Sequence, residues 1–534
     1  MGVRGVLVLF ALLTLSACRL VAPSPMPEPT ATPSPPATTR PSPAPADTAT
    51  PRATATATHA AASTPTPNQP APDYDEALRR PFREVDDQFP NATRYDLDLA
   101  LDIEAATVSG HERLVYTNAE TVPLETLYLR LFPNSPSYGG TMTVTNLMLD
   151  GQPIRGEREL QGSALRVDLE PALPPEGQIE LSLDFSLALP TDQHPADSRE
   201  PGGGYRQLGY YEQTVALANA YPIVPVYNDE GWNIELAPSH GDAVFADVAF
   251  FDVTITGPQR MTLAASGTCG ASLTGTEENT WSCIAAPMRD FNAVLRDDYQ
   301  VESQDVDGVT VKSVFYAEHA EGGGRALDYA SDTVRLFNAR IGAYPFTELD
   351  VVETPTLAGG IEYPGLVVIN RSYYADGSER MEWVVVHEVL HQWWYSLVGN
   401  DQVDEPWLDE ALTQYCTLLY YEDKYGEDVA SRLLESVFRR PYEQLQEAGN
   451  DKPAGLPVAA YDSSEYGPIV YQKGPLYFHE LRQQVGEDAF WEILQRYFDQ
   501  NRYRIATPED WLTAVEAVTG EPYRDLYENW IGTQ

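Results

Sequence analysis

The sequence predicts a multidomain protein in which an N-terminal antiparallel β saddle or sandwich precedes an α+β domain. Apolar and polar residues alternate over residues 95–101 and 178–184, with the period of two that is typical of half-buried strands. After Met381 the apolar residues follow helical spacing almost to the C-terminus. A chain of 534 residues has room for two or three domains.

Residues 1–18 have the form of an export signal. Arg4 precedes an apolar run from Val6 to Leu15, which is too short to span a bilayer comfortably. The ending Leu-Ser-Ala-Cys at residues 15–18 resembles the lipobox of bacterial lipoproteins. This resemblance implies cleavage before Cys18 and lipidation of that residue. The alternative is an ordinary signal peptide with an unrelated cysteine, and both alternatives predict an exported protein.

Residues 19–75 are rich in Pro, Thr, Ala and Ser and contain almost no large apolar side chain. Such a segment buries too little surface to offset its chain entropy, so we expect a disordered tether. Its many prolines favour an extended, semi-stiff chain. We therefore expect the folded part to be held away from the outer face of a bacterial cell membrane, with lipidated Cys18 as the anchor.

Residues 76–300 form the predicted β-rich domain, with short β-branched and aromatic runs between Gly, Pro and Asn clusters. Cys269 and Cys283 flank a Gly- and Thr-containing segment between two strand-like runs. We expect them to form a disulfide that closes a hairpin in an oxidising compartment. Cys416 lies in a helical pattern without an evident histidine partner, which favours a buried apolar role over a thiolate nucleophile.

Residues 301–534 form the predicted α+β domain. Strands are expected over 309–316, 349–354 and 360–370, with a helix over 323–340. Later helices are expected over 381–397, 409–424, 427–446, 472–485, 487–499 and 507–519. The helix that begins at Met381 is thus at the junction between the sheet and the helical part.

His387 and His391 are four positions apart on this junction helix, so both imidazoles lie on one helix face. Two neutral imidazole nitrogens and a carboxylate can bind a divalent ion and leave one position open to water. Glu388 lies about 100° around the helix from His387. That position suits a general base rather than a ligand.

The junction helix is apolar nearly all round, with valines at 384, 385, 386 and 389 and tryptophans at 393 and 394. Helices of this composition are buried. Burial of three polar side chains without partners would be costly, whereas a bound metal satisfies them. The composition therefore favours a metal site over a pair of core histidines.

Three separated motifs share their order with those of a known family. The segment His387–His391 is followed by eighteen residues (392–409) and then by Glu410. Gly359-Gly360-Ile361-Glu362-Tyr363 is similar to Gly-x-Met-Glu-Asn, and Tyr471-Gln472-Lys473-Gly474 to Tyr-x-Lys-Gly. From about residue 95 to the C-terminus the chain thus resembles the M1 gluzincin aminopeptidases. The resemblance implies a thermolysin-like zinc peptidase domain with one Zn²⁺ per chain.

By this resemblance His387, His391 and Glu410 would hold the zinc. Only Glu410 has the family spacing among the nearby carboxylates. The competing third ligands are Asp404, Glu405 and Asp409.

Glu388 would then accept a proton from the attacking water and pass it to the leaving amine. Tyr471 would donate a hydrogen bond to the developing oxyanion. Tyr466 is a weaker alternative donor.

Glu362 would lie on an edge strand, where its carboxylate pairs with the α-ammonium of a peptide and sets cleavage after the first residue. Gly359 and Gly360 would align the substrate as an added strand, because glycine permits close backbone approach. A further contact from the β domain is expected from Gln213, with Glu212 as the weaker candidate.

Two departures from the family pattern bear on specificity. Tyr363 stands where the family has Asn. Because the chain stops at Gln534, the helical C-terminal domain of many family members is expected to be absent. A more open cleft and a less strict exopeptidase would follow.

The expected activity is peptide-bond hydrolysis, chiefly removal of N-terminal residues. The alternatives are a zinc endopeptidase with an open cleft, and a non-catalytic surface binding module on the same fold. A net charge of −44 argues against a nucleic-acid partner, since phosphates would be repelled. Peptides and, through lipidated Cys18, a membrane are the expected partners; the sequence indicates no oligomeric state.

Overall fold

The computed structural model describes residues 72–191, 207–273, 277–378 and 380–532. Pro72–Gln534 form one compact unit, and the expected signal peptide, Cys18 and nearly all of the tether lie outside the described residues. Tyr74 is already buried, in a short 3-10 turn ahead of the first long strand, so it belongs to the fold although the tether was expected to end at residue 75. None of the helices in the described ranges is long and apolar enough to cross a membrane.

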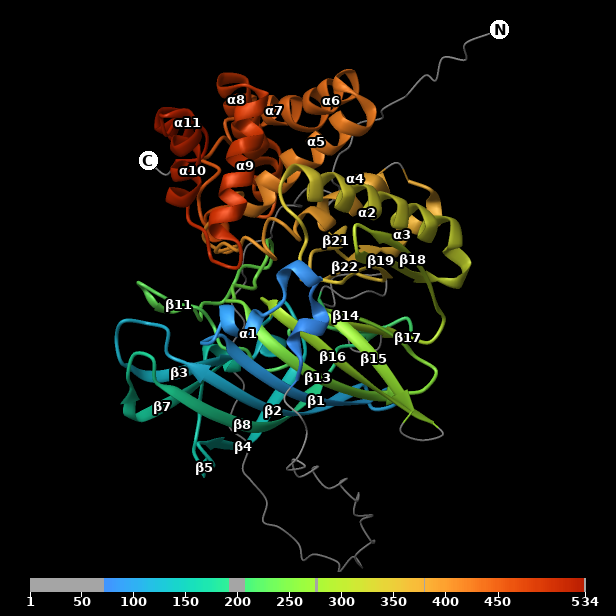
Figure 1. Cartoon of the computed structure of the whole chain (residues 1–534), viewed down its shortest axis with the longest axis vertical. Coiled ribbons are helices and arrows are strands. Elements are labelled where there is room, and N and C mark those ends of the chain that lie inside the picture. Colours follow the sequence, from blue (N-terminus) through green and yellow to red (C-terminus); the bar gives the residue numbers. More distant parts are fainter. Residues whose placement is uncertain (1–71, 192–206, 274–276, 379, 533–534) are drawn as a thin grey trace, which may run out of the picture. The chain divides into compact units, whose positions relative to one another are not determined.

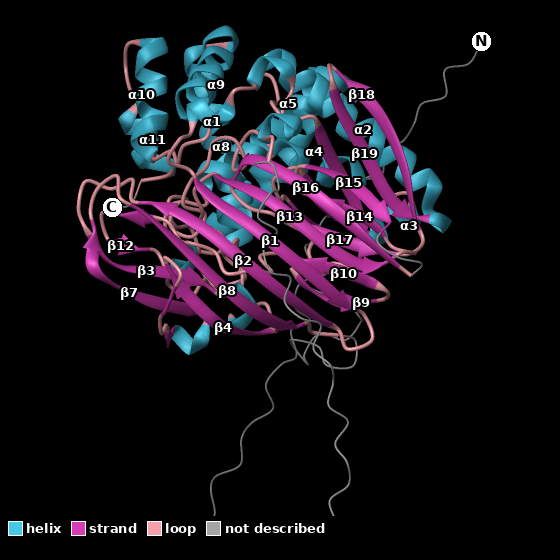
Figure 2. Cartoon of the chain, turned by 60° about the horizontal axis from the view of Figure 1, so that its bottom comes forward, coloured by secondary structure: helices cyan, strands magenta, loops and turns pink. Residues whose placement is uncertain are grey.

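The N-terminal half is built on an eight-stranded sheet of order β15-β16-β13-β1-β2-β8-β4-β5, and Figure 2 shows its long strands side by side. Alternate residues of β1 are buried, as the period of two predicts. All neighbouring pairs are antiparallel except β1 and β13, which run parallel. The strands are β1 (Thr93–Asp102), β2 (Thr107–Thr117), β4 (Thr141–Leu149), β5 (Gln152–Pro153), β8 (Gln178–Ala188), β13 (Ala249–Pro258), β15 (Thr268–Leu273) and β16 (Glu278–Met288).

Smaller sheets complete this half. Their orders are β3-β7-β6, β14-β17-β10-β9 and β11-β12. The strands are β3 (Leu124–Arg130), β6 (Glu157–Glu159), β7 (Ala164–Leu173), β9 (Leu208–Tyr211), β10 (Thr214–Leu217), β11 (Tyr227–Asn228), β12 (Gly231–Trp232), β14 (Thr262–Ala265) and β17 (Ala293–Arg296). The disulfide expected between Cys269 and Cys283 is present and joins opposed residues of β15 and β16.

A five-stranded mixed sheet of order β18-β19-β20-β22-β21 follows. The expected domain boundary at residues 300–301 falls inside its first strand. β21 is a short antiparallel edge strand beside β22, and α2 packs on the sheet and against α4. The elements are β18 (Tyr299–Val306), β19 (Val309–Tyr316), β20 (Glu348–Thr354), β21 (Gly360–Ile361), β22 (Leu366–Asn370) and α2 (Ala320–Arg340).

The rest of the chain is helical, and Figure 1 shows its later helices gathered at one end of the unit, away from the eight-stranded sheet. The helices are α3 (Arg371–Asp376), α4 (Arg380–Leu390), α5 (Leu412–Tyr425), α6 (Glu427–Leu433), α7 (Arg440–Glu447), α8 (Gly474–Val485), α9 (Glu487–Asn501), α10 (Pro508–Thr519) and α11 (Arg524–Trp530). Three π-helical turns interrupt them: η6 (Trp407–Ala411), η7 (Leu434–Arg439) and η9 (Gly467–Lys473). One buried apolar cluster contains residues of both the sheets and these helices.

The junction helix is shorter than the expected 381–397, because α4 ends at Leu390. Beyond it, backbone N–H groups donate to the carbonyl oxygen five residues earlier. Ser396 N donates to His391 O at 2.9 Å, and Val398 N to Trp393 O at 3.0 Å. Tyr395 has a φ of +119°, which no helix accommodates. The apolar spacing continued past the helix end because the turn that follows is equally buried.

Candidate metal centre

α4 carries His387 and Glu388 into the interior, and His391 follows directly after its last residue. His387 and Glu388 are each 7% exposed and His391 is 0% exposed. The valines of the helix pack into the core, which holds this face in place. The two imidazoles are therefore fixed by a rigid, buried element.

The π-helical turn η6 brings Glu410 to these histidines. Its Oε2 lies 3.2 Å from His387 Nε2 and 3.4 Å from His391 Nε2, and the two Nε2 atoms are 3.2 Å apart. Within the described ranges this is the one group of three or more His, Cys, Asp or Glu residues whose ligand atoms could share a metal ion. A wide π-turn is frequent at functional sites.

The hydrogen bonding of His391 leaves its inward nitrogen available to a cation. Its Nδ1 lies 2.9 Å from the Trp394 carbonyl oxygen, which can only accept a hydrogen bond. When the imidazole is neutral, as metal binding requires, its proton is therefore on Nδ1, and Nε2 directs its lone pair toward His387 and Glu410. This second contact is the arrangement expected for a metal-binding histidine.

The electrostatics of the cluster favour positive charge at its centre. Burial alone would raise the pKa of Glu410, but His391 and His387 outweigh burial and hold that pKa well below its usual value. Burial opposes protonation of His391, yet the charge of Glu410 raises its pKa to about 10. Burial lowers the pKa of His387. The carboxylate thus stays ionised in a buried site, where a cation would neutralise it.

Glu388 lies against the backbone of the edge strand β21. A Cβ placed on Gly360 would be 2.4 Å from Glu388 Oε1 and 2.5 Å from its Cγ. Burial raises the pKa of Glu388 well above its usual value, and Glu362 raises it further. Gly360 is therefore the residue that makes room for this carboxyl group, whereas Gly359 is exposed and its nearest neighbour, Tyr373 Oη, would be 3.6 Å from an added Cβ.

Tyr471, on the π-turn η9, reaches the same centre. Its hydroxyl donates a short hydrogen bond to Glu410 Oε1. The Tyr466 ring lies 5.8 Å from the Tyr471 ring, and its buried hydroxyl has no hydrogen-bond partner among the described residues. Burial raises the pKa of Tyr466 well above its usual value, and the charge of Glu410 raises it further, so this phenol also lies close to the cluster.

Gln402 connects Glu362 to the turn that carries Glu410. Its Nε2 donates to Glu362 Oε1 at 3.2 Å and to Asp409 Oδ2 at 2.8 Å. Asp409 Oδ1 accepts the backbone N–H of Glu410 at 2.8 Å. Asp409 thus stabilises the turn. Asp404 and Glu405 also lie outside the group of three possible metal ligands. The carboxylate of this group therefore comes from Glu410.

Asp242 was not anticipated from the sequence. It lies in an irregular segment between β12 and β13, and its carboxyl group is beside Glu410 and near Glu362 and Asp409. Burial raises the pKa of Asp242 well above its usual value, and these carboxylates raise it further. Two residues earlier, the His240 ring packs edge-on against Tyr466 with centroids 5.5 Å apart. Neither Asp242 nor His240 belongs to a spacing pattern that would have indicated a site residue.

The structure does not bring Gln213 to the metal cluster. It is exposed at the β9–β10 turn, where Glu212 and Gln213 have φ values of +48° and +66°. The Glu212 side chain pairs with Arg371, and its carbonyl accepts from Arg296. A two-residue turn with two positive φ values directs its tip outward.

Cys416 is buried on α5, as expected for an apolar role. Trp394 Nε1 lies 3.3 Å from its Sγ. Burial raises the pKa of the thiol to about 12, so a thiolate nucleophile is excluded at neutral pH.

The fold and the site define a class: α+β proteins with a His-Glu-x-x-His centre on a buried helix beside an edge strand. Residues 325–530 match the model described as the Peptidase family M1 domain. Over these residues the chain is similar to the M1 peptidase family, and the resemblance predicted from the three motifs is confirmed.

Curated relatives are similar to less than half of the chain. Aminopeptidase M1 of Arabidopsis thaliana is 27% identical over 247 residues, which make up 44% of this chain and 28% of that protein. Aminopeptidase 2 of Candida albicans is 26% identical over 264 residues, which make up 46% of this chain and 27% of that protein. The aligned part is thus little more than a quarter of these relatives.

Solved structures resemble a larger share of the chain. An M1 zinc metallopeptidase from Deinococcus radiodurans has a TM-score of 0.62 at 19% identity, covering 83% of this chain and 93% of that one. A two-domain M1 zinc metallopeptidase bound to L-arginine has a TM-score of 0.61 at 19% identity, with 83% and 94% covered. These likenesses concern the fold, including its β-rich half.

Proposed function

We propose that this protein is a zinc peptidase that removes N-terminal residues from peptides. The observation that carries the proposal is the convergence of His387 Nε2, His391 Nε2 and Glu410 Oε2, with Glu388 alongside. Two imidazoles and one carboxylate are the ligand set of catalytic zinc sites with an open fourth position. Bound zinc would polarise the scissile carbonyl and lower the pKa of water.

Glu388 is proposed as the general base and acid. Its buried carboxyl group has a raised pKa, which makes its conjugate base a stronger proton acceptor. It would take a proton from the attacking water and deliver it to the leaving amine. Proton transfer of this kind contributes roughly 10²- to 10⁴-fold to the rate.

Tyr471 is proposed to stabilise the oxyanion. Its hydroxyl donates to a ligand carboxylate, so the same proton can turn to a substrate carbonyl oxygen that enters beside Glu410. Tyr466, whose buried hydroxyl has no partner among the described residues, is the second candidate donor.

Glu362 is proposed to bind the α-ammonium of the substrate, with Asp242 as a second carboxyl group. Gln402 fixes one oxygen of Glu362, and a carboxylate has further lone pairs that can accept from an ammonium group. Burial raises the pKa of Glu362, and a neighbouring ammonium would offset the cost of ionising it. Asp242 takes the place that the sequence had suggested for Gln213.

The peptide backbone is proposed to add to the edge of the five-stranded sheet. β21 has its partner β22 on one side only. An extended peptide beside Gly360 would bring its first residues past Glu388 and Glu362.

The test compares fluorogenic aminoacyl amides with the same compounds acetylated at the amine, with and without a chelator. Hydrolysis of the free amines alone, lost on chelation and restored by zinc, is expected. Equal hydrolysis of both forms would indicate the endopeptidase alternative. Peptide binding without hydrolysis would indicate the binding module. The tripeptide Tyr-Ser-Ala, described as the substrate bound to a Deinococcus radiodurans M1 metallopeptidase, is a suitable first peptide.

Export and lipid anchoring through Cys18 are also part of the proposal. They rest on the charged, apolar and Leu-Ser-Ala-Cys segments of residues 1–18 and on the Pro- and Thr-rich stretch that follows. Metabolic labelling with an alkyne fatty acid should mark the wild-type protein and not Cys18→Ala, which should also be released from membranes. An unlabelled wild-type protein would overturn the proposal that Cys18 carries a lipid anchor.

A further inference from the structure

The edge strand β21 is only two residues long, yet the proposed catalytic site depends on its position. It pairs with residues 368 and 369 of β22, and in the described ranges no strand pairs with its other edge. Glu388 occupies the space where a Cβ of Gly360 would be, and Glu362 directly follows the strand. A ladder of two residue pairs supplies few of the hydrogen bonds that fix an edge strand. Other contacts must therefore set the position of β21.

Asn370, the last residue of β22, binds the segment that leads into β21. Its side-chain Nδ2 donates to the carbonyl oxygens of Thr356 and Ala358 at 2.6 and 3.1 Å. Its backbone N–H donates to the carbonyl oxygen of Gly359 at 3.0 Å. One residue thus binds most of the carbonyl groups that immediately precede Gly360.

The other end of the Asn370 amide fixes its orientation. Its Oδ1 accepts from Ser372 N and Oγ at 2.9 and 2.7 Å, and the first of these bonds caps the N-terminus of α3. A swapped amide would direct its donor at donors and its acceptor at acceptors. Aspartate at this position would cap the helix equally well but would lose the Nδ2 donor. The two roles of Asn370 can therefore be separated by one substitution.

Gln392 binds the segment that leaves β21. It is 0% exposed and directly follows the metal-binding His391. Its Nε2 donates to the carbonyl oxygen of Tyr363 at 3.1 Å, and its Oε1 accepts from the backbone N–H of Gly365 at 2.8 Å. A backbone hydrogen bond closes residues 363–366 into a tight turn. Gln392 thus joins this turn to the segment that carries the second imidazole.

The contact with Asn370 also determines which backbone groups of β21 face the open edge. In an antiparallel ladder, hydrogen-bonded pairs alternate with pairs that are not hydrogen-bonded. Because Asn370 N donates to Gly359 O, the following pair, Gly360 with Ile369, is of the second kind. The N–H and C=O of Gly360 therefore point away from β22, toward the side on which a peptide would add.

We propose that Asn370 and Gln392 are positioning residues for the substrate-binding edge. Their side-chain amides hold the backbone on either side of β21, and so set where Gly360 meets Glu388 and where Glu362 meets the substrate amine. Both act through this backbone rather than through contact with the substrate, and the inference rests on the proposed peptidase function. An extended peptide uses more of the edge than a single aminoacyl group, so its binding should depend more strongly on the two amides.

Steady-state kinetics of the zinc-loaded full chain with Tyr-Ser-Ala and with a fluorogenic tyrosyl amide test this proposal. Asn370→Asp should raise KM for the tripeptide about tenfold or more, and KM for the amide less than about threefold. Gln392→Met, which removes both hydrogen-bonding groups at similar side-chain size, should have the same effect. The zinc content of Asn370→Asp should stay at one per chain.

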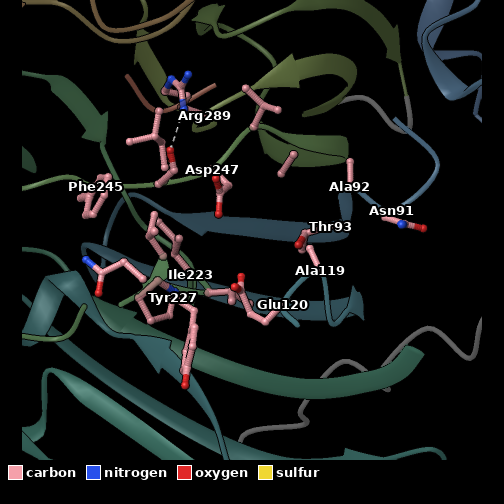
Figure 3. Close-up of a pocket in the computed structure, with 18 of the residues that line it drawn as sticks. Asn91, Ala92, Thr93, Ala119, Glu120, Ile223, Tyr227, Phe245, Asp247 and Arg289 are labelled. Carbon is pink, nitrogen blue, oxygen red and sulfur yellow. Dashed lines mark hydrogen bonds between the residues drawn. The ribbon is translucent and has the colours of Figure 1, made fainter. Parts of the chain in front are cut away.

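Hydrogen–deuterium exchange gives a readout that does not require turnover. Residues 356–361 should exchange about tenfold faster in Asn370→Asp, whereas β1 should keep its wild-type rates. The matched controls are Asn91→Asp and Gln483→Met. Asn91 is exposed and lines a separate pocket (Figure 3), and Gln483 is exposed on α8. Both controls should change KM and exchange by less than about twofold.

Two results would overturn the proposal. One is a wild-type KM for the tripeptide together with wild-type exchange of residues 356–361 in Asn370→Asp. The other is an equal rise in KM for both substrates with faster exchange throughout the chain, which would indicate a general loss of stability. If Gln392→Met fails to fold, Asn370→Asp decides alone.

Failure of the peptidase function would look different. A wild-type protein that hydrolyses neither substrate would contradict that function. Exchange of residues 356–361 would then decide whether Asn370 holds β21, with wild-type rates in Asn370→Asp counting against it.

Discussion

The carboxyl group of Glu388 occupies the space beside Gly360 where a Cβ would be, so any side chain at position 360 would clash with it. An added Cβ would be 2.4 Å from Glu388 Oε1, well inside van der Waals contact. One glycine of the edge strand therefore sets the position of the proposed general base. This contact joins the second sequence motif to the first.

Gly360→Ala should abolish most activity without loss of metal. The methyl group would displace Glu388 from its place, and a misplaced general base costs roughly 10²-fold or more. Hydrolysis of a free-amine substrate and zinc content measure the two effects. Gly270→Ala on β15, where an added Cβ meets nothing within 4 Å, is the control. Full activity of Gly360→Ala would show that Glu388 is not held by this contact.

Glu388→Gln should keep its zinc and lose turnover. The amide is isosteric with the acid but cannot accept the proton of the attacking water. We expect kcat to fall about 10²- to 10⁴-fold with one zinc still bound per chain. Undiminished kcat in a zinc-replete variant would remove Glu388 from the mechanism.

Gln402→Leu should raise KM more than it lowers kcat. Gln402 is 2% exposed and donates to both Glu362 and Asp409, so its loss leaves two buried carboxyl groups without that donor. We expect KM for free-amine substrates to rise about tenfold, because the ammonium-binding group loses its fixed orientation. Gln484→Leu on the exposed face of α8 serves as the control. An unchanged KM with a folded protein would contradict the positioning role.

Glu112→Gln should flatten the pH dependence of stability. Glu112 is 0% exposed on β2, and both of its carboxyl oxygens lack a hydrogen-bond partner in the described part of the chain. Burial raises the pKa of Glu112 well above its usual value. The folded state thus keeps a proton that the unfolded chain releases, and stability falls as pH rises between the two pKa values.

Urea unfolding across this pH range measures the effect. The wild-type free energy of unfolding should carry a downward contribution of up to about 1.4 kcal/mol per pH unit from this group. Glu112→Gln should lack that contribution, and Glu492→Gln on the exposed face of α9 should retain it. Identical slopes for Glu112→Gln and wild type would show that the folded state accommodates the charge.

The sequence predicted the metal-binding residues better than the structure around them. His387 and His391 follow a helical spacing, which local geometry converts into proximity. Glu410 was predicted from the chain separation that the family resemblance implies. The sequence did not indicate that α4 ends at Leu390, because the apolar pattern runs on through a buried turn. Nor did it indicate the π-turn η6, since apolar spacing does not distinguish a wide turn from an α-helical one.

Residues brought in by long irregular segments could not be predicted. Asp242 reaches the site from a stretch without period between β12 and β13, so its position depends on tertiary packing alone. Gln213 was expected there, but a two-residue turn with positive φ values turns it outward. The parallel pairing of β1 with β13 was equally hidden, because alternation along a strand does not reveal its neighbour's direction.

The most direct test of the account is the zinc content of purified protein, measured together with its hydrolysis of a free-amine substrate. We predict one zinc per chain, loss of both metal and activity with a chelator, and recovery of both on adding zinc. His391→Ala should prevent that recovery. Metal-free protein that hydrolyses the substrate at the same rate would contradict the account.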